Sequence, residues 1–156
     1  MNDCFVIRGD VPLRGEIFPS GNKNAALPTL AASLLTDEPV ILRNLPAIRD
    51  VEVMAELLQI LGVDVERLDA KTWRLQAQRV CMPSNDVDRE LFRAIRGSIT
   101  IAGPLLARLC DLSIPAPGGD MIGRRRVDTH FMAFQELGAE VSVENGNFVL
   151  KADHLT

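Results

Sequence analysis

The chain has 156 residues, of which 47% are hydrophobic and 24% are charged. This length suits one domain with one core, and the composition lacks the polar, highly charged character of a disordered chain. With 17 basic and 21 acidic residues the net charge is −4, so the chain as a whole has no field that attracts nucleic acid or an anionic membrane. Any anion-binding site must therefore be local.

The sequence predicts no membrane anchor and no secretion signal. The longest uncharged run, residues 24–36, is far shorter than the ~20 residues of a membrane span. The apolar stretch near the start, residues 4–7, is too short for the core of a signal peptide. Cys4, Cys81 and Cys110 show neither CxxC spacing nor a neighbouring group of histidines. We therefore expect a cytoplasmic protein with reduced, packed thiols and with neither a metal site nor a cofactor.

The pattern of apolar residues predicts the elements of the first half. Two short strands are expected in residues 4–17, a helix at 25–36, a strand at 39–42, a helix at 50–61 and two strands at 63–68 and 72–77. The first helix contains no charged residue, so neighbouring elements must cover it on several sides. Its Pro28 is compatible with a helix only within the first turn. Gly62 fits the position that ends the second helix, and Trp73 is expected to pack on the sheet.

The second half repeats this order. It is expected to hold a helix at 91–109, a strand at 111–115, a loop rich in glycine and proline, a helix that ends near Leu137, and two further strands. The helix ends LGVDV (residues 61–65) and LGAEV (residues 137–141) match, which indicates two copies of one unit. A unit of helix, strand, helix and two strands is typical of an α/β fold with mixed sheet pairing.

A glycine turn that opens the first helix is the first candidate site. In SGNKNAALP (residues 20–28), Gly21 is followed by Lys23 at the mouth of the helix. Free N–H groups, the helix dipole and the lysine charge favour an anion there. Ordinary capping of the helix by Asn22 or Asn24 explains the same residues equally well. The spacing is not that of a P-loop.

A second candidate site is the loop PGGDMIGRRR (residues 117–126). Its glycines permit close approach to a ligand, and its consecutive arginines can grip phosphate or carboxylate. The loop is therefore either an anion-binding lid or a solvated turn with surface arginines. Asp120 within it is either a turn-former, which is the commoner role, or a proton carrier.

Arginines at the start of the second uncharged helix form a third candidate site. The offset that aligns the two helix ends also carries Gly21 onto Gly97, so both copies can direct a cation at one cleft. The alternative is that Arg93 and Arg96 only border a helix and extend their charged ends into water. The two histidines lack the spacing of a metal pair and are expected at the surface or in supporting positions.

Four segments, in this order, resemble one enzyme family. They are GNKNAALP (residues 21–28), EPVILRNLPAIRDVEVM (38–54), RGSITIAGPLLAR (96–108) and PGGDMIGRRRVDTH (117–130). Together they resemble UDP-N-acetylglucosamine enolpyruvyl transferase over nearly the whole chain. That family moves the enolpyruvyl group of phosphoenolpyruvate to the 3-hydroxyl of UDP-N-acetylglucosamine, the first committed step of the peptidoglycan synthesis that builds the cell wall and maintains cell shape.

The resemblance implies an inside-out α/β barrel built from repeated units. Residues 21–156 would form a partial catalytic domain of two repeats, 21–79 and 80–156, while residues 1–20 would supply strands that pair within the second domain. Family members are much longer, so the resemblance implies an N-terminal portion that lacks the remainder of the enzyme. We expect such a chain alone to bind its substrates weakly and to show negligible turnover.

The resemblance also implies roles for individual residues. Lys23 and Asn24 would contact phosphoenolpyruvate and the sugar, and Arg96 would hold the nucleotide sugar or the anions of the cleft. Arg125 would meet the phosphate of phosphoenolpyruvate. The nucleotide-sugar site would be lined by Arg125, Arg126, Val127, Asp128 and Thr129.

Asp120 would take the place of the proton donor in the loop, where most family members carry cysteine. A free aspartate has a pKa near ~3.9, so it is a poor acid at neutral pH unless its surroundings raise that pKa. We expect Asp120 to become competent only when the loop closes over phosphoenolpyruvate. Because a carboxylate is a weaker nucleophile than a thiolate toward an epoxide, we also expect insensitivity to fosfomycin.

Two alternatives to this interpretation stay open. The sister enzyme that acts on shikimate phosphate shares the fold and a lysine near the first helix. A non-catalytic fragment or binding module would carry the same residues without activity. The partners expected in the leading interpretation are the two small-molecule substrates, with no nucleic acid and no membrane. A melting temperature that rises with UDP-N-acetylglucosamine would separate a ligand-binding chain from an inert one.

Overall fold

The computed structural model describes residues 4–10, 12–83, 86–119 and 126–155, with only the backbone of residues 86–88. The first half contains α1 (Lys23–Ala32), the 3-10 helix η1 (Ser33–Leu35), β1 (Val40–Leu42), α2 (Arg49–Ile60), β2 (Asp64–Arg67) and β3 (Trp73–Gln76). The second half contains α3 (Asp86–Ala94), the 3-10 helix η2 (Arg96–Ile101), α4 (Ala102–Leu109), β4 (Asp111–Pro115), α5 (Asp128–Glu136), β5 (Glu140–Glu144) and β6 (Asn147–Lys151).

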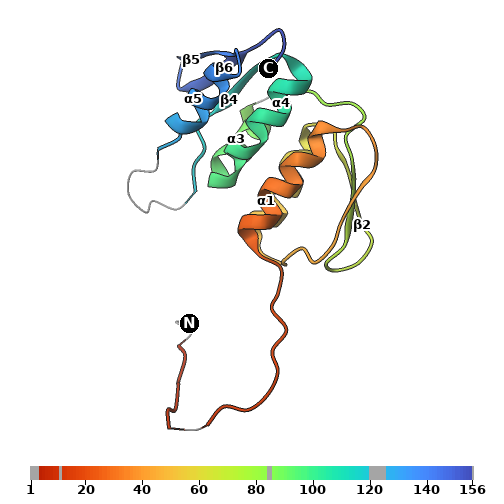
Figure 1. The fold of residues 1–156 in the computed structure, drawn as a ribbon, viewed down its shortest axis with the longest axis vertical. Coiled ribbons are helices and arrows are strands. Elements are labelled where there is room, and N and C mark those ends of the chain that lie inside the picture. Colours follow the sequence, from red (N-terminus) through yellow and green to blue (C-terminus); the bar gives the residue numbers. More distant parts are fainter. Residues whose placement is uncertain (1–3, 11, 84–85, 120–125, 156) are drawn as a thin grey trace.

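Figure 1 shows α1, α3 and α4 between the strands of the two halves. None of the helices within the described ranges is long and apolar enough to cross a membrane.

Each half contributes one three-stranded sheet. The strand orders are β1-β3-β2 and β4-β6-β5, and every pairing between these described strands is antiparallel. The expectation of mixed pairing is therefore wrong. β1 and β2, which precede and follow α2, do run in the same direction, but β3 lies between them and pairs with both. β3, the hairpin partner of β2, thus lies between β1 and β2 and prevents these two strands from pairing in parallel.

α1 is covered on more than one side, as its lack of charged residues predicts. The helix packs against α2 and against η2. Its buried residues are Ala26, Leu27, Leu30 and Ala31. They belong to one hydrophobic core that joins both halves of the described chain. α1 is therefore a central element, and its N-terminal end is held firmly in place.

The start of α1 is fixed by a side-chain cap. The side-chain oxygen of Asn22 accepts hydrogen bonds from the backbone N–H groups of Asn24 and Ala25, at 2.7 and 3.3 Å. Capping by Asn22, one of the two explanations for this turn, is thus confirmed. The helix begins at Lys23, so Pro28 lies beyond the first turn, and the expectation that it would lie within that turn is wrong. Burial of the apolar face offsets the hydrogen bond that proline cannot donate.

The two matching helix ends have the same backbone geometry. Gly62 and Gly138 both have a φ of +92°, which a glycine adopts without strain. The residue after each glycine donates its N–H to the carbonyl of Leu58 or Phe134, at 3.0 and 2.9 Å. The prediction that Gly62 ends the second helix is confirmed.

The single helix expected at residues 91–109 is wrong, because the chain there forms α3, η2 and α4. Ile95 is extended, with φ −134° and ψ 146°, and ends α3. The Ser98 hydroxyl donates to the Ile95 carbonyl at 2.9 Å and so competes with helical bonding. A Cβ on Gly97 would lie 2.7 Å from Leu27 Cδ1, so this segment approaches α1 very closely. Tertiary packing against α1 therefore determines where the helix breaks.

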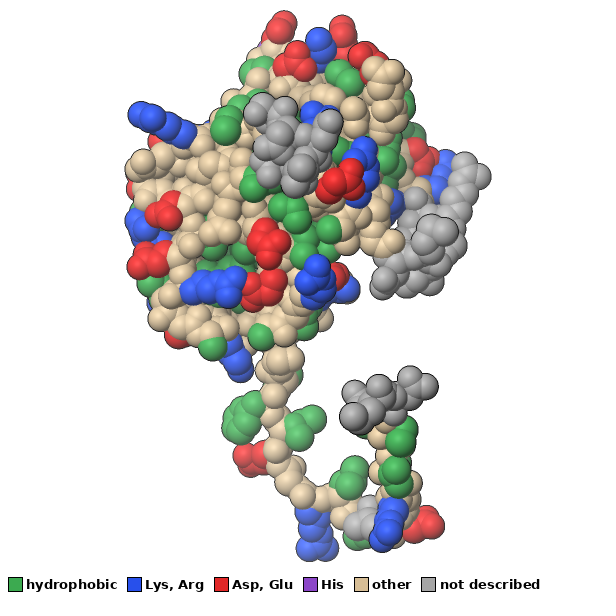
Figure 2. Space-filling model, turned by 180° about the vertical axis from the view of Figure 1, so that it is seen from behind, with side chains coloured by type: hydrophobic (Ala, Val, Ile, Leu, Met, Phe, Trp, Pro, Cys, Tyr) green, Lys and Arg blue, Asp and Glu red, His purple; other side chains and the backbone are tan. Residues whose placement is uncertain are grey.

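The two strands expected in residues 4–17 are absent, since residues 4–10 and 12–20 contain neither helix nor strand. This N-terminal segment extends away from the body of the molecule (Figure 1), and hydrophobic side chains stand out along it in Figure 2. Its large apolar residues are 86% to 97% exposed, namely Phe5, Val6, Ile7, Leu13, Ile17 and Phe18. β-formers make a strand only when they pair with a sheet edge, and this segment pairs with none of the described strands.

Trp73 packs on the sheet as predicted, whereas the cysteines differ from expectation. Trp73 is only 3% exposed, and the guanidinium carbon of Arg67 lies 5.0 Å from its ring centroid. Cys4, Cys81 and Cys110 are free but exposed, so the expectation of packed thiols is wrong. Each stands outside the helices and strands of the described chain.

Candidate functional site

A cavity of about 440 Å³ opens beside the N-terminal ends of α1, η2 and α5. Segments far apart in the sequence meet there, because α1 packs against both α2 and η2. Its lining residues are Lys23, Asn24, Leu27, Pro28, Asp50, Arg96, Gly97, Ile99, Thr100, Arg126, Val127 and His130. We call this hollow the α1–η2 cavity.

Five of the predicted site residues border the α1–η2 cavity, namely Lys23, Asn24, Arg96, Arg126 and Val127. The two that follow them in the sequence lie in the first turn of α5 and do not line it; they are Asp128 and Thr129. The predicted residues Asp120 and Arg125 lie outside the described part of the chain. The glycine turn and the second uncharged segment thus present cations to the same hollow.

Lys23 is held by a carboxylate on the opposite wall. Its Nζ atom lies 2.8 Å from Asp50 Oδ2, and the two side chains are 49% and 36% exposed. Asp50 stands in the first turn of α2, where the positive end of the helix dipole favours a carboxylate. The ion pair directs the lysine toward the cavity and balances part of its charge.

Two arginines connect η2 with the start of α5. Arg96 Nη2 donates to the Arg126 carbonyl at 3.3 Å. The Arg126 guanidinium in turn holds the Asp128 carboxylate through two contacts, one of them from Nε to Oδ1 at 3.0 Å. The hydrogen bond and the charge of Asp128 raise the pKa of Arg126 above its usual value. Asp128 therefore orients the Arg126 guanidinium at the rim, and the guanidinium carries its charge with or without this partner.

Glycines place the polypeptide directly against Arg96. The Gly119 N–H donates to the Arg93 carbonyl at 3.2 Å. A Cβ on Gly118 would lie 1.9 Å from the Arg93 carbonyl oxygen, and one on Gly119 would lie 2.9 Å from the Arg96 backbone nitrogen. A side chain at either position would push residues 118–119 away from Arg93 or Arg96. The glycines of the second candidate site thus have a structural role beside Arg96.

The sequence did not single out Asp50 or His130, yet both line the α1–η2 cavity. Asp50 reads as an ordinary acidic residue in the first turn of an amphipathic helix. His130 lies in the first turn of α5, where the only available signal was its place in the PGGDMIGRRRVDTH segment. Asp50 reaches the site because α2 packs against α1 and η2, and His130 reaches it because α5 begins beside Arg126 and Val127.

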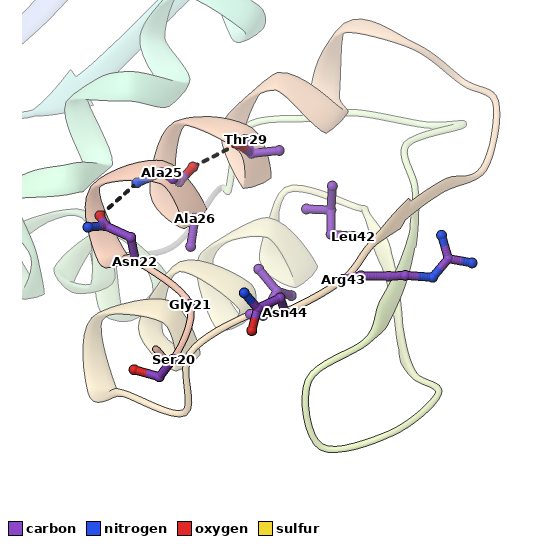
Figure 3. Close-up of a pocket in the computed structure, with 10 residues that line it drawn as sticks. Ser20, Gly21, Asn22, Ala25, Ala26, Thr29, Leu42, Arg43 and Asn44 are labelled. Atoms are coloured by element: carbon purple, nitrogen blue, oxygen red, sulfur yellow. Dashed lines mark hydrogen bonds between the residues drawn. The ribbon is translucent and has the colours of Figure 1, made fainter. Parts of the chain in front are cut away.

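A second hollow, of about 370 Å³, lies on another side of α1 (Figure 3). Beside it, the backbone at Gly21 approaches Asn44 so closely that a Cβ on residue 21 would lie 1.9 Å from the Asn44 carbonyl oxygen. Asn44 has a φ of +59° at this close approach. Arg43 lines this hollow together with Ser20, Gly21 and Asn22 of the glycine turn, but Lys23, Asn24 and Arg96 do not. The hollow therefore lies beside the turn and away from the predicted cations.

The α1–η2 cavity has the chemistry of an anion site. It gathers the ammonium of Lys23, the guanidinium groups of Arg96 and Arg126, and the amide of Asn24. Guanidinium and ammonium groups bind phosphate and carboxylate oxygens through charge-assisted hydrogen bonds. Within the described residues no group of three or more His, Cys, Asp or Glu side chains is placed to hold a metal ion. The arrangement favours a small phosphorylated ligand.

The fold and this cavity fit the class of enolpyruvyl transferases, and comparison with known proteins gives the family. The model of the EPSP synthase (3-phosphoshikimate 1-carboxyvinyltransferase) family matches residues 7–154. The chain therefore belongs to this family. In the solved structures, the enolpyruvyl transferase NikO from Streptomyces tendae superposes with a TM-score of 0.73 at 24% identity, over 95% of this chain and 32% of that one. This likeness establishes the α/β fold of an enolpyruvyl transferase.

Curated relatives narrow the resemblance to one branch of the family. The UDP-N-acetylglucosamine 1-carboxyvinyltransferase of Treponema denticola is 47% identical over 93% of this chain and 34% of its own length. The enzymes of the same name from Bradyrhizobium diazoefficiens and Helicobacter pylori strain J99 are 48% and 44% identical, over 88% and 96% of this chain and 32% and 35% of theirs. The chain thus spans about a third of the length of the curated relatives it matches. The resemblance drawn from its four motifs is confirmed.

Proposed function

We propose that this chain supplies one wall of the active site of a UDP-N-acetylglucosamine enolpyruvyl transferase, in the cytoplasm, at the first committed step of peptidoglycan synthesis. The observation that carries the proposal is the α1–η2 cavity, where cations from α1, η2 and the start of α5 converge. The relatives that share 44–48% of its residues carry the name of that activity.

The reaction needs positive charge at the places where these residues stand. In the proposed mechanism the sugar 3-hydroxyl gives its proton to a base in the remainder of the enzyme and attacks C2 of phosphoenolpyruvate while C3 is protonated. The tetrahedral ketal then loses phosphate from C2 and a proton from C3, which restores the double bond. Lys23 and Arg96 bind the anionic groups and stabilise the charge that develops on them. Arg125 meets the phosphate, and Asp120 donates the proton.

Asn24 contacts the sugar and phosphoenolpyruvate in this proposal. The nucleotide sugar lies along Arg126, Val127, Asp128 and Thr129. The Arg126–Asp128 contact supports this part of the proposal, since it presents a fixed guanidinium at the rim.

We further propose that the described fold is part of an inside-out α/β barrel made of repeated units, residues 21–79 and 80–156. The matching strand orders of the two sheets and the shared geometry at Gly62 and Gly138 support the repeat. Residues 1–20 would pair within another domain of the complete enzyme, which accords with their exposed apolar side chains.

The chain alone is expected to bind substrates weakly and to release almost no phosphate. The Lys23 side chain is 49% exposed and the Arg126 side chain is 73% exposed. Charges in contact with water stabilise a transition state far less than charges in a closed site. Robust phosphate release by the purified chain would contradict this expectation.

A chimera tests the proposed function directly. Residues 7–154 replace the matching segment of the Treponema denticola relative, and phosphate release from phosphoenolpyruvate is followed with UDP-N-acetylglucosamine as acceptor. We expect turnover that Lys23→Ala lowers about 100-fold or more, the usual effect of removing one charge-stabilising group. Lys71→Ala, which removes an exposed lysine outside the cavity, should leave the rate unchanged.

Two outcomes would contradict the proposal. One is a folded chimera that releases no phosphate. The other is a chimera that accepts shikimate 3-phosphate in place of the nucleotide sugar, which would assign the segment to the sister enzyme of the family.

The same chimera tests the role of Asp120. Because a carboxylate attacks an epoxide poorly, fosfomycin should leave the chimera active, whereas Asp120→Cys should make it susceptible to time-dependent inactivation. Mass spectrometry checks for an adduct at this position. An adduct on Asp120 itself would overturn the prediction, and full turnover by Asp120→Asn would exclude this residue as the proton donor.

A further inference from the structure

We propose that Asp50 is a positioning residue, which aims Lys23 into the α1–η2 cavity and balances its charge until a phosphorylated anion takes the carboxylate's place. The inference rests on the proposed function of the cavity as an anion site. It adds a role for a residue that neither the motifs nor the resemblance singled out.

The geometry of the pair supports this role. Lys23 is the first residue of α1 and Asp50 is the second residue of α2, so each side chain leaves the N-terminal end of a buried helix. Both line the cavity, and Lys23 Nζ donates to Asp50 Oδ2 at 2.8 Å. Because α1 and α2 pack against each other, their helices hold the backbones of the two residues close together. The ion pair then directs the lysine ammonium into the cavity.

The charges of the lining show what an entering anion meets. Among the described residues that line the cavity, Asp50 alone carries a carboxylate. The other carboxylate close by, Asp128, does not line the cavity and holds Arg126 at the rim. An anion that approaches Lys23 must therefore compete with Asp50 for the ammonium and is repelled by the same carboxylate.

This competition has a defined consequence for binding. In the free chain Asp50 already restrains the long side chain of Lys23. The lysine therefore loses less conformational entropy when an anion binds to it. Once the anion is bound, the carboxylate opposes it. Removing the charge of Asp50 should thus tighten the binding of a small phosphate anion while loosening the orientation of Lys23 in the free chain.

The experiment compares Asp50→Asn with a matched control. Asp111 forms a similar pair with Lys151, at 3.2 Å, outside the cavity, so Asp111→Asn removes the same charge elsewhere. Inorganic phosphate and phosphoenolpyruvate are titrated into the purified chain at low ionic strength by calorimetry. We expect Asp50→Asn to lower both dissociation constants about two- to fivefold, the scale on which half-exposed charges act on each other, and Asp111→Asn to change neither.

A double-mutant cycle shows whether Asp50 acts through Lys23. In the Lys23→Ala background the effect of Asp50→Asn should fall well below its effect in the original chain. An equal effect in both backgrounds would show that the carboxylate acts on the anion directly, and it would overturn the positioning role.

A measurement without ligand completes the test. The ammonium resonance of Lys23 in proton–nitrogen NMR should be sharp in the original chain and in Asp111→Asn, and broadened in Asp50→Asn. An unchanged resonance, or a chain that binds phosphate no better after Asp50→Asn, would overturn the inference and leave the proposed function standing. If phosphate binds to none of the variants, Asp50 controls no anion site in this chain and the inference fails, while the chimera decides the proposed function separately.

Discussion

At the residue scale, Gly62 and Gly138 have the same backbone conformation but differ in how closely other atoms surround them. Both have a φ of +92°, so alanine is strained at either position. A Cβ on Gly62 would also lie 2.2 Å from the Arg79 carbonyl oxygen, whereas the nearest atom to one on Gly138, the His154 carbonyl oxygen, is 4.0 Å away. We expect Gly62→Ala to lower the free energy of unfolding about 1–3 kcal/mol more than Gly138→Ala, the range for overpacking at a site that cannot yield.

Urea unfolding of the two variants measures this difference. Equal losses would show that the chain near Arg79 moves aside without cost. The sequence motifs LGV and LGA identify both glycines as helix ends, but they contain no information about Arg79. The prediction that alanine costs more at Gly62 than at Gly138 needs the structure, because it depends on the contact of Gly62 with Arg79, which is distant in the sequence.

At the scale of elements, Arg108 ties α4 to the first half of the chain. Its guanidinium donates to the carbonyls of Leu34 and Ala77, each at 3.0 Å, in a partly buried position. Arg108→Met keeps most of the side-chain volume but leaves these two acceptors without their charged donor. We expect a loss of about 2–4 kcal/mol in the free energy of unfolding, from two hydrogen bonds to a charged group that are only partly replaced by water.

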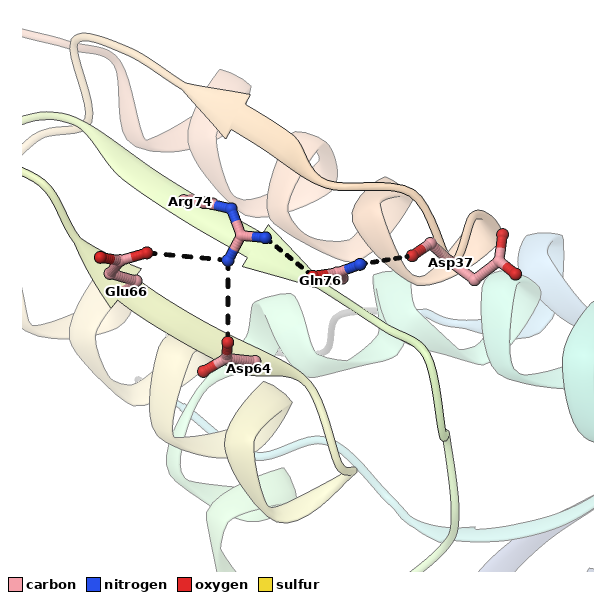
Figure 4. Close-up of polar contacts among 5 residues, drawn as sticks. All are labelled: Asp37, Asp64, Glu66, Arg74 and Gln76. Atoms are coloured by element: carbon pink, nitrogen blue, oxygen red, sulfur yellow. Dashed lines mark hydrogen bonds and ion pairs between the residues drawn. The ribbon is translucent and has the colours of Figure 1, made fainter.

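Arg74 is the matched control, since it joins polar residues on the outer face of the first sheet (Figure 4). Its guanidinium donates to Gln76 at 2.8 Å and lies 3.8 and 3.7 Å from the carboxylates of Asp64 and Glu66. Ion pairs near the surface contribute little, so Arg74→Met should cost about 1 kcal/mol or less. If urea unfolding gives the same loss for both arginines, Arg108 has no special role between the two halves.

The elements that the sequence predicted well are those with a strong local pattern. α2 has an apolar face at helical spacing and a glycine at its end, and it lies within one residue of its predicted bounds at each end. β4 matches its predicted range, 111–115. The break at Ile95 could not be predicted, because it arises where Gly97 packs against Leu27 of another helix. The local spacing of apolar residues does not reflect a contact with another helix, so it cannot predict this break.

At the scale of the whole molecule, the candidate site was predictable only in part. Lys23 and Arg96 belong to glycine-containing motifs whose spacing already suggests two cations at one cleft, and the structure places both at the same cavity. Asp50 and His130 enter that cavity because α2 and α5 pack as they do. An acidic residue at the start of an amphipathic helix has the same appearance whether or not it faces a site, so one sequence could not reveal it.

The N-terminal segment, residues 4–18, should contribute nothing to the stability of the body it leaves. All its described side chains are exposed, and its large apolar residues contact water instead of the core. Deleting residues 1–18 should therefore change the free energy of unfolding in urea by less than about 0.5 kcal/mol, whereas Leu30→Ala, in the core, should cost about 2–5 kcal/mol. The deletion should also reduce the fluorescence of a dye that binds exposed apolar surface. A stability loss above about 1 kcal/mol on deletion would show that the segment packs against the domain in solution.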